Sequence, residues 1–238
     1  MERRTAIDAI ALGALIALGL ALAGLFIGNG LLRARSADRY VTVRGFAERE
    51  FPANLVIWPI VYTVTSDDLV ALQRGIDDGA EKIRAFLGAD FSPDEISQSP
   101  PRVTDRQAQG FTGQTGRLER YVAEATVTVR TPRIETAMAA MTRSGELVAQ
   151  GIALIRSYEH TTEYLYTDLD KIKPEMIAEA TRDARAAAQQ FAEDSGSRVG
   201  GIRNAQQGYF SIEDRDRFSP QFKKIRVVTT IQYFLVDD

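Results

Sequence analysis

The chain has 238 residues, and its 29 basic and 32 acidic side chains give a formal net charge of −3. This near balance argues against a basic surface for nucleic acid. The chain has no cysteine, which excludes disulfides, thiolate metal sites and cysteine nucleophiles, and it has a single histidine, His160.

An uncharged apolar stretch, residues 9–32, is the strongest signal near the N-terminus. As an α-helix rising ~1.5 Å per residue it would span roughly 36 Å, more than a hydrocarbon core of about 30 Å. We therefore expect a short tail over residues 1–8, a single transmembrane helix over 9–32 and a linker over 33–39. The alternative is a cleaved signal peptide with a small-x-small site at Ala21-Leu22-Ala23. The apolar run continues past that site through Ile27, which favours a retained anchor.

Small residues recur on this predicted helix and could let two helices approach closely. Gly24 and Gly28 form a G-x-x-x-G pair, and basic residues on both sides of the stretch leave its orientation open. The candidate packing positions are Ala9, Gly13, Ala17, Ala21, Gly24 and Gly28.

The first strands of the soluble part are predicted over residues 40–48 and 55–65, because both segments are rich in apolar and β-branched side chains. Pro52 separates them. Pro59 has no N–H to donate, so it indicates an edge strand or a bulge. Trp58, the only tryptophan, is interpreted as core packing rather than as a ligand platform.

A helix is predicted to begin at Asp67 or Asp68 as its N-cap and to end at Gly88. A turn at residues 92–95 then leads into a strand over 96–104, and the polar, glycine-containing residues 105–120 indicate a flexible loop. The helix carries an apolar stripe that should face a core: Leu72, Ile76, Ala80, Ile83 and Leu87.

Residues 121–130 alternate between apolar and polar side chains, which predicts a strand with one face on a core. Thr131 and Pro132 then indicate the start of a helix, because proline at the first helical position loses no hydrogen bond. The apolar stripe predicted for this helix consists of Ile134, Met138, Met141 and Val148.

The remaining elements are a strand over 155–166, a long alanine-rich helix over 174–194 ended by Gly196, and strands over 202–210 and 225–236. The helix should present a small-residue face to a sheet: Ala180, Ala184, Ala187, Ala188 and Phe191. Strands joined by short links with helices between them predict an α+β domain over residues 40–238, with antiparallel or mixed sheets and helices packed on one face. Two subdomains, about 40–130 and 131–238, are an alternative to one domain.

The segment Val41-Thr42-Val43-Arg44-Gly45-Phe46-Ala47-Glu48, followed by Pro52-Ala53-Asn54-Leu55, resembles the start of the SIMPL domain, a bacterial domain of poorly defined function. The alanine-rich helix with Gly196 and Gly200-Gly201, and the strand 227–231, match the same pattern. Asn54, where the family often has Asp, and the Trp58-Pro59 pair depart from it. The resemblance implies an extracytoplasmic α+β domain, ring-like homo-oligomers in some members and a loose link to the envelope or to oxidative stress. The resemblance identifies no catalytic residue in this sequence.

Few side chains suggest chemistry. Ser195 beside Gly196 resembles a protease nucleophile segment, but it is better explained as a helix end. Asp168, Asp170 and Glu175 lack the spacing of a calcium loop, and Asp170 suits a helix start. Lys223, Lys224 and Arg226 are interpreted as a solvated strand edge. No catalytic, cofactor or metal site is therefore predicted.

The predicted face formed by Tyr158, His160, Tyr164 and Tyr166 is interpreted as an oligomer interface, since tyrosine combines an apolar body with a polar tip. We expect a non-enzymatic protein anchored in the bacterial inner membrane, with its domain in the periplasm, where it self-assembles. The alternative is a ligand-binding or sensory module that uses the same Tyr/His face. An unrecognised hydrolase ranks last.

Overall fold

The structure is a computed structural model, and it describes residues 13, 16–30, 39–109 and 118–237. The chain divides into two compact units. The first unit consists of Met1–Glu48, Lys173–Phe210 and Arg226–Asp238, and the second of Arg49–Ile172 and Ser211–Ile225. The sequence predicts two possible subdomains that meet near residue 130. The units are discontinuous in sequence, because the first strand pairs with the last strand of the chain.

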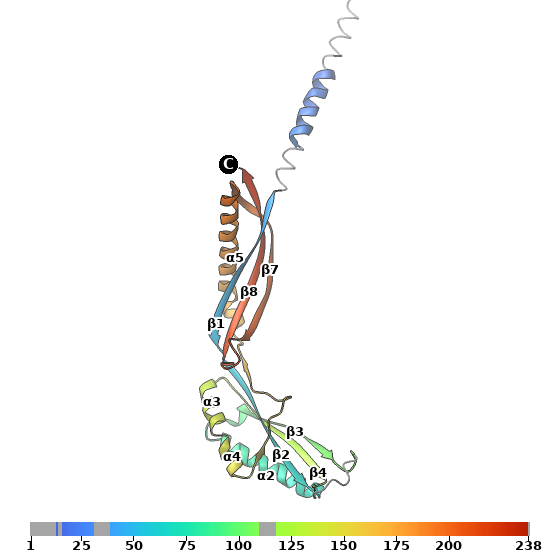
Figure 1. Ribbon diagram of the computed structural model, residues 1–238, viewed down its shortest axis with the longest axis vertical. Helices are drawn as coiled ribbons and strands as arrows, with labels where there is room; N and C mark the ends of the chain where they lie inside the picture. The colour runs from blue at the N-terminus through green and yellow to red at the C-terminus, as the bar shows by residue number, and fades with distance from the viewer. Residues whose placement is uncertain (1–12, 14–15, 31–38, 110–117, 238) are drawn as a thin grey trace, which may run out of the picture. The chain divides into compact units, whose positions relative to one another are not determined.

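The first unit is a three-stranded sheet in the order β1-β8-β7 with one long helix packed along it (Figure 1). The strands are β1 (Tyr40–Pro52), β7 (Ser197–Asp214) and β8 (Phe222–Asp237), and the helix is α5 (Leu169–Asp194). β8 is the central strand, so the predicted solvated edge at Lys223 is wrong. Lys223 is only 8% exposed and contacts the carboxylate of Asp214.

Helix α5 buries every fourth residue against the sheet. The buried positions are Met176, Ala180, Ala184, Ala188 and Ala192. The small-residue face was therefore predicted correctly at three positions, but Ala187 and Phe191 are exposed. A strict spacing of four keeps one narrow stripe on the sheet, and Ala187 and Phe191 lie outside that stripe.

Alanine on α5 is matched by glycine on β1. A Cβ added to Gly45 would lie 2.1 Å from the carbonyl oxygen of Ala180 and 2.2 Å from the amide nitrogen of Ala184. The backbones of strand and helix thus touch at this point, which only glycine permits. The core beside this contact contains Val41, Ala188, Ile231 and Tyr233.

The ends of α5 differ in how well the sequence predicts them. Gly196 has φ +64°, which confirms the predicted left-handed stop. The helix begins at Leu169 rather than at Pro174, so Pro174 lies inside it. Asp170 is in the first turn, as predicted, and its carboxylate suits the positive end of the helix.

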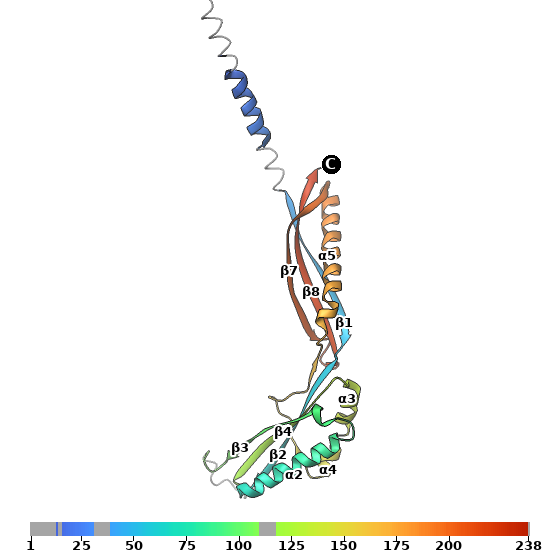
Figure 2. The same ribbon diagram turned by 180° about the vertical axis from the view of Figure 1, so that it is seen from behind.

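The second unit is built on an antiparallel sheet in the order β3-β4-β2-β5, and β6 also pairs with β2. The strands are β2 (Leu55–Ser66), β3 (Ile96–Asp105), β4 (Tyr121–Thr131), β5 (Ala153–Leu154) and β6 (Glu163–Leu165). Helices α2 (Leu69–Leu87), α3 (Ile134–Thr142) and α4 (Gly145–Ala149) lie on one side of this sheet, as the opposite views of Figures 1 and 2 show.

The core of the second unit follows from the alternation predicted for its strands. Trp58 pairs with Val129, Ile60 with Val127 and Tyr62 with Ala125, so that these side chains share the face under the helices. Asp68 is the N-cap of helix α2, and its Oδ1 accepts a hydrogen bond from the amide of Ala71 at 2.8 Å. All five residues of its predicted apolar stripe are buried: Leu72, Ile76, Ala80, Ile83 and Leu87.

The single helix predicted after Thr131 is wrong. The chain forms two short helices, α3 and α4, with Arg143 and Ser144 between them. Thr131 still belongs to β4, where it pairs with Val56, so the first helix begins later. The buried helix residues are Ala137, Ala140 and Leu147, whereas Met138 and Val148 of the predicted stripe are 37% and 57% exposed.

Candidate assembly surface and ligand site

Strand β7 is the most exposed strand of the first unit. It is an edge strand of 18 residues, whereas strands usually have about 5–6. Every residue from 201 to 207 is exposed, so neither face of the strand is covered there. Ile202 is 55% exposed and Tyr209 is 99% exposed. A long, open, proline-free edge of this kind can pair with another strand.

The same sheet has a second edge at β1, which has β8 as its only neighbour in the strand order. Along β1 the exposed side chains alternate with buried ones, and Phe46 is 52% exposed. Arg226 of β8 lies over the Phe46 ring at 5.2 Å from its centroid. The sheet therefore has two edges, β1 and β7, and on β1 the Phe46 amide already donates to Asp183 Oδ2 of α5 at 3.0 Å.

The predicted membrane segment is helical over residues 16–30, and its described apolar side chains are exposed, including Leu20 at 70% and Phe26 at 77%. Gly13, Ala17, Ala21, Gly24 and Gly28 are exposed on helix, and a Cβ at any of the three glycines would meet no atom of the chain within 4 Å. Ala9 lies outside the described residues. No helix among the described residues is long and apolar enough to cross a membrane.

The continuous strand predicted over 155–166 is wrong. Only β5 and β6 form, and the backbone between them is irregular. Pairing of β2 is interrupted here, so residues 155–162 form no strand and the predicted single Tyr/His face is not present. Tyr158 and His160 are exposed outside any strand. The His160 Nδ1 lies 3.3 Å from the Ser157 hydroxyl.

The other two residues of that face are half-buried in different surroundings. Tyr164 lies in β6, its hydroxyl is 3.8 Å from the Met141 sulfur, and burial raises its pKa. The Tyr166 ring packs against Phe51 at a centroid distance of 5.2 Å, and burial also raises its pKa. Neither tyrosine shares a strand with Tyr158 or His160, and the role of these residues as an interface stays a prediction.

The remaining polar residues singled out from the sequence have structural partners. The Ser195 hydroxyl donates to the carbonyl of Ala192 at 3.1 Å, as expected at a helix end. Lys171 donates to Asp168 at 2.8 Å and lowers the pKa of that carboxyl. Among the described residues, no group of three or more potential ligand side chains could hold a metal ion.

Asn54, which departs from the SIMPL pattern, supports the start of the second unit. Its Oδ1 accepts hydrogen bonds from the amide of Thr167 at 2.9 Å and from the Thr167 hydroxyl at 3.1 Å. The backbone N–H of Asn54 donates to the carbonyl of Leu165 at 2.9 Å. An aspartate could accept the same two bonds, so this departure keeps the local contacts.

A hollow of about 360 Å³ lies beside β2, and sequence reasoning did not find it. β5 pairs with Tyr62 and Thr63, and β6 pairs with Leu55, Val56 and Ile57, so neither strand pairs with residues 58–61. Pro59 was predicted to mark an edge or a bulge. β2 is an inner strand, but it has no strand partner on one side at Pro59. This proline was the one signal in the sequence that could have indicated the hollow.

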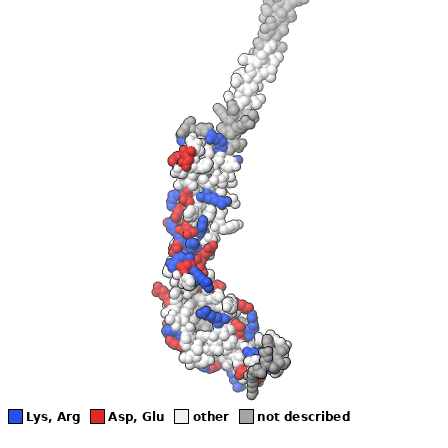
Figure 3. Space-filling view, in the orientation of Figure 1, with Lys and Arg blue, Asp and Glu red and all other residues white. Residues whose placement is uncertain are grey.

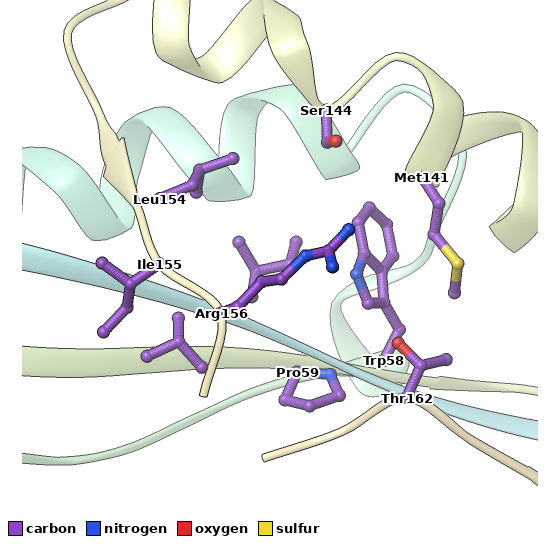
Figure 4. A pocket seen from close by; sticks show the side chains of 10 residues that line it. Trp58, Pro59, Met141, Ser144, Leu154, Ile155, Arg156 and Thr162 are labelled. Carbon is purple, nitrogen blue, oxygen red and sulfur yellow. The ribbon is translucent and has the colours of Figure 1, made fainter. Parts of the chain in front are cut away.

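The side chains of this hollow come from β2, from the two short helices and from the segment between β5 and β6. Figure 4 shows Arg156 extending across the hollow toward the Trp58 indole, with the Ser144 hydroxyl on one side and Thr162 on another. The lining residues are Trp58, Pro59, Ile60, Val61, Met141, Ser144, Leu154, Ile155, Arg156 and Thr162.

Comparisons with known proteins identify a family. A comparison with curated proteins gives no match. A family model described as "SIMPL: Protein of unknown function (DUF541)" matches residues 41–232, which include most of β1 and β8 and all the strands between them. Since the matched residues cover well over half of the chain, this protein belongs to the SIMPL family.

Proposed function

We propose that this protein is a non-enzymatic, membrane-anchored component of the bacterial envelope that assembles with copies of itself into a closed ring. The observation that carries the proposal is the exposed edge of β7, where residues 201–207 are uncovered on both faces. The extracytoplasmic location and the stress-related role come from the family resemblance. The alternative, a sensory module on the Tyr/His segment, has weaker support because these residues do not share a face.

The first sheet has two different edge strands, β1 and β7, which favours a ring over a symmetric dimer. Pairing of β7 in one copy with β1 in the next is a heterologous contact, which leaves one unsatisfied edge at each end of a linear assembly. Closure of the assembly satisfies all edges. It also protects a long exposed strand from unspecific pairing. The mixed charges on the face drawn in Figure 3 present no field of one sign that would repel an identical copy.

The apolar N-terminal segment supports the membrane part of the proposal. The sequence has no charged side chain from residue 9 to 32, and the exposed apolar residues of helix 16–30 need another apolar environment. Anchoring confines the copies to a surface and raises their effective concentration, so that a modest edge contact suffices. The small residues Gly24 and Gly28 leave room for a second helix beside the first.

Native mass spectrometry and light scattering of the full chain in a non-ionic detergent test the assembly. We expect one defined oligomer at micromolar concentration. The double variant Ile202→Lys/Tyr209→Lys places two charges on the β7 edge and should weaken association by at least thirtyfold, since a buried aromatic anchor contributes about 2 kcal/mol or more.

Phe218→Lys is the matched control, because Phe218 is 90% exposed and lies between β7 and β8 rather than on the edge. It should leave the oligomer unchanged. A monomeric wild-type protein at these concentrations would refute the proposal, and so would an oligomer that resists the double variant or dissociates equally in the control.

A further inference from the structure

We propose that the hollow beside β2 binds a small organic anion, with Arg156 as the residue that recognises its charged group and Trp58 as part of the apolar wall. This site differs from the assembly edge in unit and in residues, and it uses neither Tyr158 nor His160. The ligand class that fits is a small carboxylate with an aliphatic or aromatic body.

The backbone of β2 explains why the hollow exists. Val61 accepts a hydrogen bond from the amide of Ile155 at 2.9 Å, so its polar backbone atoms point away from β4. Pro59 lies two residues earlier and therefore points the same way, since strands have a period of two. Proline has no N–H to offer a neighbouring strand. The pairing with β5 and β6 stops on either side of it, and the gap stays open.

The walls of the hollow combine apolar surface with a few hydrogen-bond donors. Ile60, Met141 and Leu154 contribute aliphatic or thioether surface beside the Trp58 ring. Ser144 and Thr162 contribute hydroxyl groups, and Arg156 contributes the only charge among the lining residues. A concave site of about 360 Å³ with a few convergent polar groups is typical of small-molecule binding.

Several arginines of this unit have a carboxylate partner, whereas Arg156, like Arg74 and Arg130, has none among the described residues. Arg102, Arg120, Arg133 and Arg143 each form an ion pair, with Glu159, Asp105, Glu95 and Asp90 respectively. Among the described residues, no carboxylate lies within ion-pair distance of Arg156. A guanidinium that reaches over this hollow without an anion of its own is complementary to an anionic ligand, which it can bind with two parallel hydrogen bonds.

Residues 155–162, which connect β5 to β6, hold Arg156 in place. One end of the segment bonds to β2 through Ile155, and Glu159 is 3.3 Å from Arg102 of β3. Both partners of that ion pair are about two-thirds exposed, so the contact is weak. The segment is therefore held chiefly through its two ends at β2.

Fluorescence of the lone tryptophan gives a direct test, because Trp58 lines the hollow. The full chain in non-ionic detergent is titrated with cyclohexanecarboxylate and, separately, with the neutral cyclohexanecarboxamide. Neither probe absorbs at the excitation wavelength. We expect a saturable change in Trp58 emission with the carboxylate, and at least tenfold weaker binding of the amide.

Arg156→Gln should weaken carboxylate binding at least tenfold and leave the amide titration unchanged. Arg74→Gln, on the exposed side of α2, should have no effect on either titration. Circular dichroism of both variants should match the wild type, because both side chains are exposed. Equal curves for carboxylate and amide, wild-type binding by Arg156→Gln, or no saturation below about 10 mM would overturn the proposal.

Discussion

Gly45→Ala tests the closest contact in the first unit, that between β1 and α5. The added Cβ would stand 2.1 Å from the Ala180 carbonyl oxygen, and Cβ atoms essentially never approach another heavy atom within 3.0 Å. Strand and helix must therefore separate by about 1 Å. Both contact atoms on the helix belong to the backbone, so no side-chain rotation can relieve the clash.

The expected loss follows from this separation. Overpacking a core by one carbon usually costs about 1–3 kcal/mol, and a gap of up to 1 Å removes a quarter to a half of the dispersion energy of the surrounding contacts. Since the obstruction is backbone on both sides, we expect a loss near 3 kcal/mol in the free energy of unfolding. This is a large part of the 5–15 kcal/mol that stabilises a typical domain.

Hydrogen-exchange mass spectrometry of the full chain measures the effect where it arises. Exchange of peptides from α5 should accelerate about a hundredfold, because each 1.4 kcal/mol corresponds to a factor of ten. Gly145→Ala is the control, since a Cβ there meets no atom within 4 Å and the substitution favours helix α4. Ala184→Gly in the same chain should not rescue Gly45→Ala. Rescue, or less than threefold acceleration, would refute the backbone-contact explanation.

Three further substitutions have signs fixed by the structure. Hydrogen bonds, chiefly one from the Thr131 hydroxyl at 2.5 Å, lower the pKa of Glu95 from 4.5 to about 2. Ionised Glu95 therefore stabilises the fold above pH 4.5, and this stabilisation disappears as the pH falls toward 2. Glu95→Gln should therefore destabilise by about 1–2 kcal/mol at pH 7, with a smaller deficit in urea titrations at pH 2–3. Thr229→Val should raise the melting temperature, because the buried Thr229 hydroxyl has no hydrogen-bond partner among the described residues. Asp68→Ala removes the acceptor for the Ala71 amide and should cost about 1 kcal/mol by urea denaturation.

The elements with strong periodicity could be predicted from the sequence. Helix α2 has a side-chain N-cap and a complete apolar stripe, and all the apolar positions predicted for the core face of β4 are buried, so local pattern and tertiary packing agree. The predicted strand over 155–166 failed for the opposite reason. Its tyrosines and threonines favour strands, but the neighbour they need is interrupted at Pro59.

The candidate sites were harder to predict, because each depends on a neighbouring strand that is absent in the folded chain. β7 was predicted as residues 202–210, but its true length follows from pairing with β8, and its exposure follows from its place at the end of the strand order. The sequence predicts no role for Arg156, since an arginine in a polar segment is common. Its significance comes from its position over the hollow that Pro59 leaves open.

The assembly edge and the anion site can be tested independently, because they belong to different units and share no residue. Substitutions at sites without shared partners usually add, within about 0.3–0.5 kcal/mol. The β7 variant should thus keep its response to carboxylate, and Arg156→Gln should keep its oligomer. If instead the carboxylate changed the oligomer distribution in the wild type but not in Arg156→Gln, the two sites would be coupled, and by thermodynamic reciprocity assembly would change carboxylate affinity by the same factor. That result would make the hollow a control site for the ring rather than a separate function.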